Sequence, residues 1–488
     1  MMRLRFGFPA VLLLGASLLA GCRSNVEALR QAAVARAATA PVPGEAAPDA
    51  PPPSPPPQAL EAPLPPLTSL PGSVGIVVCE PVPKAADAAA VDFGAGCGRW
   101  LFFTVGGPPE LGQTPLWSEV ERARMELGKS DLRLALPDAV RLGGALGVTH
   151  VAVGTIAGSA AHCTLSYQIW AVPHGRAVGG PFVVAGTQAQ VLARLPALAR
   201  QMAHHLGVAA PRVPAAVGAR PADVVLAGQV PWGPEETPNS AQAAALQSLS
   251  ARWPLAALLA LNTGLRGDQK LPFVANALLT QAPDNPLGYA QLGYVQPAAL
   301  RPYSAVLAAY RRRFPNNYAL AHADVWWGRE SKNPQAEHTA ALQTARDAPR
   351  NPDAWLTLGY TLSDEAARVR KGRTVGMISA QEWQYLDTVY ARWLAAVSRA
   401  ARLDPRYGRA WARIAEAATF DGQSAIADRA FWNALRWDPD HADVYGWGLE
   451  MYQEKWGGDP MTLAKVAGLA AADHYPTVGE AVSVADDL

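Results

Sequence analysis

Three glycines at alternating positions are the residues of this chain whose spacing best fits a chemical role. Gly94, Gly96 and Gly98 lie close together, and such glycines can let the backbone approach a bound cofactor. A cofactor loop of this kind follows a buried strand and opens a helix. Here Lys84–Ala90 is rich in Ala and Asp, and Trp100–Val105 has the pattern of a strand instead of a helix. The context therefore argues against a cofactor site.

The surrounding residues, Val91–Arg99, resemble the first motif of S-adenosylmethionine-dependent methyltransferases. That resemblance implies a cofactor loop, and an enzyme with its site in the middle of the chain is one alternative for the function. The sequence contains no Gly-x-Ser-x-Gly, no phosphate-binding Gly-x4-Gly-Lys-Ser/Thr and no His-Glu-x2-His motif. We therefore predict a protein that is not an enzyme and that holds no cofactor.

The N-terminus predicts the cellular compartment. Arg3 and Arg5 precede a short apolar run that ends in LAGC at residues 19–22. The run is too short to span a bilayer, which needs ~20 apolar residues, and it resembles the signal of a bacterial lipoprotein. The resemblance implies cleavage after residue 21 and a lipid on Cys22. Because Arg23 follows the cysteine, it also implies the periplasmic side of the outer membrane. An ordinary cleaved signal is the alternative.

Cysteine and histidine spacing does not predict a metal site. No CxxC pair occurs, and His204 and His205 are adjacent on a predicted helix, where they face different directions. With Cys22 lipidated, Cys79, Cys97 and Cys163 remain, and three thiols cannot all pair. In an oxidising compartment we expect a disulfide between the first two of them. Buried unpaired thiols are an equal alternative.

Residues 41–66 contain 12 prolines in 26 positions. No core can form from such a segment, and a polyproline II conformation is expected. At ~3.1 Å per residue the segment reaches on the order of 80 Å. We interpret residues 22–71 as a disordered tether between the membrane and the folded domains. A ligand for a proline-binding domain is the weaker alternative.

Residues 72–208 have the pattern of a small α/β domain. Strands are predicted at Val74–Cys79, Thr149–Ile156, Thr164–Val172 and Pro181–Ala185, and helices at Trp117–Leu127, Leu136–Leu146 and Thr187–Leu206. The last two strands form a hairpin through His174 and Gly175. This order of elements resembles the TolB N-terminal domain, a resemblance that implies no catalytic residue. A second proline-containing link, residues 209–240, follows and includes apolar residues that favour packing over free movement.

Prolines return on a fixed period in the C-terminal half, at Pro283, Pro315, Pro349, Pro405 and Pro439. They are 32, 34, 56 and 34 residues apart, a period typical of helical repeats. Large aromatic residues such as Trp355 and Trp411 stand six positions after most of these prolines. Residues 241–475 are therefore predicted to form pairs of helices, and residues 476–488 a tail.

Two stretches within these units, W-x2-L-G-x2-L at 355–362 and A-x3-F-x2-A-x4-P at 427–439, resemble the tetratricopeptide repeat. Small residues such as Gly359 suit the crossing of two helices. The resemblance implies a concave face, built from the first helix of each pair, that suits a peptide or protein segment. Its inner-face positions are Tyr294, His322, Trp326, Asp353, Tyr360, Asp364, Arg409, Glu416, Asp443 and Glu450.

Tyr360, Glu416 and Glu450 hold one position in three successive units. We expect them to form an exposed row along the concave face. For the aromatic residues of the predicted face, a place in the core is the alternative, and for the charged ones an ordinary solvated surface.

The spacing of 56 residues corresponds to one 34-residue unit with 22 additional residues. We place the addition near Arg368–Glu382, where four basic residues occur, namely Arg368, Arg370, Lys371 and Arg373. Insertions in repeat arrays often carry binding. A solvated loop is the equal alternative.

Charge does not select a partner, because 42 basic and 41 acidic residues leave a net charge of +1. No nucleic-acid partner is predicted. The predicted fold is α+β and multidomain, with a small α/β domain before an all-α repeat array. We predict a membrane-anchored periplasmic lipoprotein that binds or scaffolds other envelope proteins or peptides. Besides the enzyme, a structural subunit of an envelope or secretion complex is an alternative.

Overall fold

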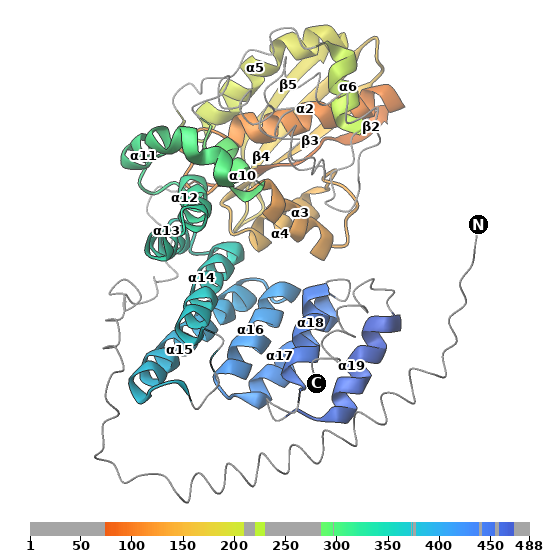
Figure 1. Cartoon of the computed structure of the whole chain (residues 1–488). Coiled ribbons are helices and arrows are strands. Elements are labelled where there is room, and N and C mark those ends of the chain that lie inside the picture. Colours follow the sequence, from red (N-terminus) through yellow and green to blue (C-terminus); the bar gives the residue numbers. More distant parts are fainter. Residues whose placement is uncertain are drawn as a thin grey trace, which may run out of the picture. The chain divides into compact units, whose positions relative to one another are not determined.

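A computed structural model describes residues 74–208, 220–229, 285–295, 297–371, 373, 377–438, 442–453 and 458–472 (Figure 1). The predicted signal, Cys22, the proline-rich segment, residues 230–284 and the tail lie outside these residues. Within the described ranges, no helix has both the length and the apolar character that crossing a membrane requires.

Five strands form one mixed sheet (Figure 1). They are β1 (Ile76–Val78), β2 (Val82–Ala86), β3 (His150–Gly158), β4 (Cys163–Ala171) and β5 (Arg176–Gly186). β1 and β2 pair with β3 in parallel, one after the other along its length, and β4 pairs with β3 antiparallel. β5 continues the sheet antiparallel to β4. Four predicted strands, Val74–Cys79, Thr149–Ile156, Thr164–Val172 and Pro181–Ala185, and the hairpin are confirmed, whereas β2 was not predicted.

Helices cover both faces of this sheet. α2 (Ala88–Gly106), α4 (Leu136–Ala145) and α5 (Gln188–His205) pack on the strands, whereas α3 (Trp117–Glu126) packs on α4 and α6 (Pro221–Gln229) packs on α2. A Cβ atom on Gly94 of α2 would lie 3.1 Å from Ile156, and one on Gly143 of α4 would lie 2.7 Å from Val151. Because Val151 and Ile156 are an odd number of residues apart on β3, they point to opposite faces. The sheet therefore lies between α2 and α4.

The strand predicted at Trp100–Val105 is wrong, because these residues form the C-terminal part of α2. The helix is buried along most of its length, so its apolar residues do not show a helical period that sequence inspection can detect. The glycines of α2 allow neighbouring elements to pack closely against this helix. A Cβ atom on Gly96 would lie 2.1 Å from the carbonyl oxygen of Val224, and one on Gly98 would lie 2.9 Å from the hydroxyl of Tyr167. The cofactor loop that this motif suggested is not formed.

The predicted Cys79–Cys97 disulfide is also wrong. Cys79, Cys97 and Cys163 are buried and free. The segment between the first two cysteines is not the expected loop, because it forms β2 and the first half of α2, whose packing sets the place of Cys97. Burial, with a smaller contribution from the charge of Glu80, raises the pKa of Cys79 to about 12, so this thiol stays protonated at neutral pH.

Helix α6 belongs to the predicted link of residues 209–240 and packs on α2. Val224 is buried, and the Arg99 guanidinium donates to the carbonyl oxygen of Ala227 while its Nε lies 2.7 Å from Glu80 Oε1. The described part of the link is thus packed, as its apolar residues predicted.

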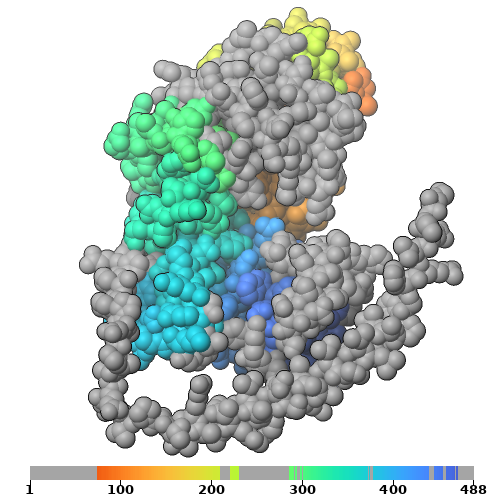
Figure 2. Space-filling view, viewed as in Figure 1, coloured from red at the N-terminus to blue at the C-terminus, as the bar shows by residue number. Residues whose placement is uncertain are grey.

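The C-terminal half is helical. Its elements are α10 (Pro286–Val295), the 3-10 helix η2 (Pro297–Tyr303), α11 (Ser304–Arg313), α12 (Tyr318–Glu330), α13 (Pro334–Asp347), α14 (Pro352–Arg370), α15 (Ala380–Leu403), α16 (Gly408–Phe420), α17 (Ser424–Trp437), α18 (Ala442–Met451) and α19 (Pro460–Ala472). α12 packs on α13, α14 on α15, α16 on α17, and α18 on α19. The space-filling view shows α10 to α15, green to cyan, following one another in chain order (Figure 2).

The first helices of these pairs begin at Tyr318, Pro352, Gly408 and Ala442, with the spacings of the prolines. The predicted array of helical repeats after an α/β domain is therefore confirmed. At one helix crossing, a Cβ atom on Gly359 would lie 2.5 Å from Val397 of α15, which explains why a residue without a side chain stands there.

The additional residues between Pro349 and Pro405 mostly lengthen a helix pair, so the insertion placed near Arg368–Glu382 does not form a loop over that whole range. α14 has 19 residues against 13 in α12 and α16, and α15 has 24 against 14 in α13 and α17. Ser379 caps α15 through Glu382, whose side chain also pairs with Arg373 at 2.7 Å. These bonds among neighbouring residues cap the N-terminus of α15 and so end the connection between α14 and α15.

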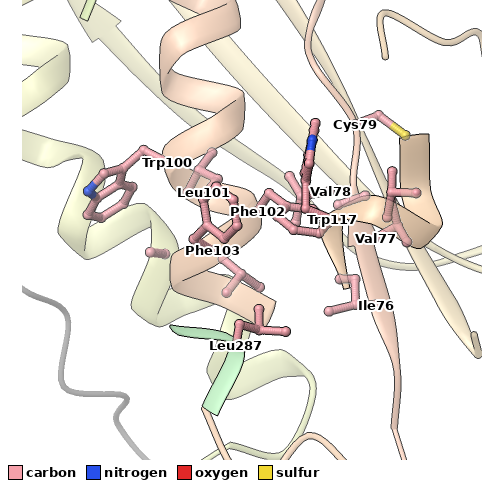
Figure 3. Close-up of a cluster of buried hydrophobic side chains, with 14 of the residues drawn as sticks. Ile76, Val77, Val78, Cys79, Trp100, Leu101, Phe102, Phe103, Trp117 and Leu287 are labelled. Carbon is pink, nitrogen blue, oxygen red and sulfur yellow. The ribbon is translucent and has the colours of Figure 1, made fainter. Parts of the chain in front are cut away.

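The hydrophobic core does not stop between the sheet and the first repeats. One cluster of buried side chains joins the sheet and its helices to residues of α10, α12 and α14, and a second cluster fills the later repeats. Figure 3 shows Phe103 of α2 and Trp117 of α3 in the first cluster together with Leu287 of α10. The rings of Phe102 and Trp117 meet edge to face, with centroids 5.0 Å apart. Because this core is continuous, it fixes where α3 meets the repeats.

Candidate binding face of the helical repeats

All ten residues predicted for the concave face lie on the first helices. Tyr294 is on α10, His322 and Trp326 on α12, Asp353, Tyr360 and Asp364 on α14, Arg409 and Glu416 on α16, and Asp443 and Glu450 on α18. We call the side of these helices that carries them the inner face. The side chains of Tyr294 and Asp443 lie outside the described part of the chain.

Five of the ten occupy the same helical position, eight residues after the first residue of their helix: Tyr294, Trp326, Tyr360, Glu416 and Glu450. Neighbouring first helices pack on one another in the order α14, α16, α18. The predicted row therefore follows successive first helices, although the described contacts connect its members only in part.

Tyr360 and Glu416 are brought together through Arg413, which the sequence analysis missed. Arg413 Nη1 lies 2.5 Å from Glu416 Oε2, and its guanidinium carbon lies 4.8 Å from the centre of the Tyr360 ring and 5.5 Å from that of Trp447. The Ser363 hydroxyl reaches Glu416 Oε1 at 3.5 Å. One arginine thus links side chains of three successive first helices. The signal in the sequence was its place three residues before Glu416, on the same side of a helix.

Glu416 is buried, with 4 % of its surface exposed, so the expectation of an exposed Glu416 is wrong. Burial raises the pKa of this carboxyl to about 7, against the opposing effect of Arg413. The cause is tertiary, because the sequence places Glu416 correctly on the first helix but cannot show how closely α14 covers it. Glu450 is half-buried, and no described contact joins it to Glu416.

Other predicted residues are engaged within the chain. The Trp326 indole donates to His322 Nδ1 at 3.1 Å, and burial lowers the pKa of His322 to about 4. Asp364 pairs with Arg329 at 2.7 Å and keeps 46 % of its side chain exposed. Arg409 is exposed.

Asp353 binds helix α3 of the sheet domain. Its Oδ2 lies 2.8 Å from Nη2 of Arg122, whose Nη1 lies 2.9 Å from Asp404 Oδ2. The Arg122 guanidinium carbon stands 3.9 Å from the centre of the Tyr407 ring, and the Tyr407 hydroxyl donates to Asp353 Oδ1 at 2.6 Å. Only 11 % of the Arg122 side chain is exposed. The N-terminal ends of α14 and α16 thus form a closed site for an arginine of the same chain.

A second buried residue of α3 reaches the repeats one turn earlier. Glu119 accepts hydrogen bonds from the Tyr318 hydroxyl and, at 3.0 Å, from Asn351 Nδ2. Burial, followed by the charge of Asp353, raises the pKa of Glu119 to about 8. The sequence analysis placed α3 correctly but did not foresee this contact, because its partners are some 200 residues away in the chain.

The described residues contain no group of three or more His, Cys, Asp or Glu arranged to hold a metal ion. The described side chains of the inner face are aromatic rings, arginines and carboxylates.

No protein-family model and no curated protein matches this chain. Among solved structures, its helical repeat region is similar to a monomeric mutant of IFIT1 with Gppp-AAAA, at a TM-score of 0.39 and 12% identity over 61% of this chain and 67% of that chain. A second IFIT1 mutant, with m7Gppp-AAAA, has a TM-score of 0.41 and 11% identity over the same shares. This similarity concerns the fold, and the ligands of those structures do not bear on this chain.

Proposed function

We propose that this chain is a binding or scaffolding protein whose repeats hold a segment of another protein on the inner face. The strongest support for this proposal is the way the repeats bind helix α3 of the same chain. At the N-terminal end of the inner face the repeats already hold a protein helix, through an arginine enclosed by two carboxylates and a tyrosine ring. A surface that binds one helix of its own chain has the chemistry to bind a second segment beside it.

The adjoining part of the inner face, on α14, α16 and α18, is the proposed site for the partner. Tyr360, Arg413 and Trp447 are half-buried there, which leaves part of each side chain available for contact. Tyr, Trp and Arg contribute much of the binding energy in protein interfaces because they combine large apolar area with directed polar groups.

We further propose that the chain is a lipoprotein of the bacterial envelope, anchored through Cys22 and displayed on the periplasmic side, in the outer membrane. The short apolar run that ends at a cysteine supports this, as does the resemblance of residues 72–208 to the TolB N-terminal domain. The partners would then be other envelope proteins or peptides. In this proposal the protein has no catalytic activity and binds no nucleic acid.

Two matched double variants test the binding face. Asp364→Lys with Arg409→Glu changes two exposed charges on first helices, and Asp387→Lys with Arg402→Glu makes the same changes on the second helix α15. We expect the first pair to weaken partner capture from envelope extracts at least tenfold and the second pair to leave it unchanged. A photo-crosslinking residue in place of Tyr360 should give an adduct with the same partner. Equal capture by both double variants, with no adduct, would refute the proposed face.

A further inference from the structure

The contact between α3 and the repeats contains more carboxyl groups than cations. Glu126 of α3, Asp353 of α14 and Asp404 after α15 lie around Arg122, and Glu119 lies one turn before Arg122 on α3 and close to the charge of Asp353. The guanidinium nitrogens lie 2.7 Å from Glu126, 2.8 Å from Asp353 and 2.9 Å from Asp404. These three carboxylate side chains are only 8–14 % exposed, and Glu119 is 4 % exposed. Four negative charges beside one positive charge, away from water, are strongly unfavourable.

Among the described residues, the remaining titratable groups that face this site are Tyr318 and His322 of α12 and Tyr407 and Arg409 at the start of α16. Burial keeps His322 neutral at pH 7, because it lowers the pKa of the imidazole to about 4. Arg409 is exposed and acts on Tyr407 from the surface. Protonation of the carboxyl groups is therefore the way to balance the charge.

We infer that the contact between α3 and the repeats is a proton-dependent latch, in which the buried carboxyl groups keep at least one proton while α3 is docked and lose it when α3 leaves. Glu126 is the first candidate to hold the proton, since its carboxyl group lies beside Arg122 together with the carboxylate of Asp404. Glu119 is the second candidate, because it is only 4 % exposed and lies close to the charge of Asp353.

The direction of the pH effect follows from the pKa shifts of Glu119 and Glu126. Burial raises the pKa of Glu119 to about 8, and burial raises that of Glu126 to about 8 against the opposing effect of Arg122. The ordinary value of 4.5 returns when α3 is exposed to water. At a pH between 4.5 and about 8, the two glutamates therefore hold protons when α3 is docked and have released them when it is undocked. Docking is therefore favoured below about pH 4.5 and weakens as the pH rises to about 8.

Undocking would expose Asp353 and the hydroxyl of Tyr318 at the N-terminal end of the inner face. The latch would thereby control how much of that face is open. This inference does not depend on a partner, because it concerns a contact within one chain.

Hydrogen–deuterium exchange of the full-length protein at pH 6, 7, 8 and 9, corrected for the intrinsic exchange rate, tests the latch. For each proton released, the undocking constant rises up to about tenfold per pH unit between the two pKa values. We expect protection of the α3 amides to fall by at least about tenfold from pH 6 to pH 8, while α5 stays protected. Glu126→Gln keeps a neutral side chain at every pH and should flatten this fall. Glu110→Gln, at an exposed carboxyl group outside the contact, is the matched control and should follow the wild type.

Protection of α3 that does not change with pH, or an equal fall in the wild type and in Glu126→Gln, would overturn the inference. Should Glu126→Gln fail to fold, infrared spectroscopy of the wild type with 13C-labelled glutamate decides instead. The same spectrum is recorded for Glu416→Gln, because burial raises the pKa of Glu416 to about 7. A protonated carboxyl band that remains in this variant at pH 7 and is lost by pH 9 supports the latch, and its absence at pH 7 refutes it.

Discussion

Arg413 and Glu416 form the ion pair on which the inner face depends at the scale of single residues. Glu416 is buried under α14, and its carboxylate binds both Arg413 and Ser363. The pair orients the guanidinium between the rings of Tyr360 and Trp447. Glu416 was expected to contact a partner directly. In the structure it instead holds Arg413 in place, and Arg413 is the residue that can contact a partner.

Reversing the charge of Glu416 should unfold the repeats instead of only weakening the binding of a partner. Glu416→Lys places a second cation beside Arg413 in a buried site, and breaking a buried pair costs ~3–5 kcal/mol of unfolding free energy. Asp387→Lys, at an exposed position of α15, should change stability by within ~0.5 kcal/mol. Urea denaturation at pH 7.5 measures both. Equal stabilities of the two variants would contradict the burial of Glu416.

At the scale of elements, asparagine caps connect the helices to the sheet domain. Asn317, Asn333 and Asn351 cap α12, α13 and α14, each accepting a backbone N–H bond with its side-chain oxygen. The amide nitrogen of Asn317 also donates to the carbonyl oxygens of Pro109 and Leu111, and that of Asn351 donates to Glu119. The side chain of Asn333 makes only the cap bond among the described hydrogen bonds. Two of the three caps therefore serve two elements at once.

Because the cap at Asn351 also bonds to the sheet domain, replacing asparagine by alanine should lower stability more at position 351 than at position 333. Asn333→Ala should lose a cap, which costs ~0.5–2 kcal/mol. Asn351→Ala should lose the cap and also remove one of the donors to the buried Glu119, which adds ~0.5–1.5 kcal/mol. Thermal unfolding of the two variants at pH 7 gives the comparison. A similar loss from both would mean that the bond to Glu119 contributes little.

At the scale of the whole molecule, one continuous core joins the sheet domain to the first repeats, and the residues beyond it at the N-terminus are predicted to attach it to a membrane. Wild-type protein should incorporate a palmitate analogue in bacterial cells. Cys22→Ser should remove the label and leave the signal uncleaved, since the lipid is added to the cysteine thiol. Cys163→Ser, at a buried thiol, should retain the label. An unlabelled wild type would rule out the proposed anchor.

Local patterns in the sequence determined the repeats. The spacing of the prolines predicted the starts of α12, α14, α16 and α18, and the ten residues chosen for the inner face all lie on first helices. The reason is that a helix pair depends on contacts between residues near each other in the chain, so its signals appear within one period. The predicted binding role of these residues remains a prediction.

Only the tertiary structure decided how these elements are used. Trp100–Val105 is helical although its pattern predicted a strand, because α2 is buried on several sides, a condition that removes the helical period from its sequence. The cysteines are unpaired. The docking of Arg122 against Asp353 and Asp404 likewise joins residues more than 200 positions apart. Such contacts depend on the continuous core that places α3 against the repeats, and no local pattern of residues encodes that placement.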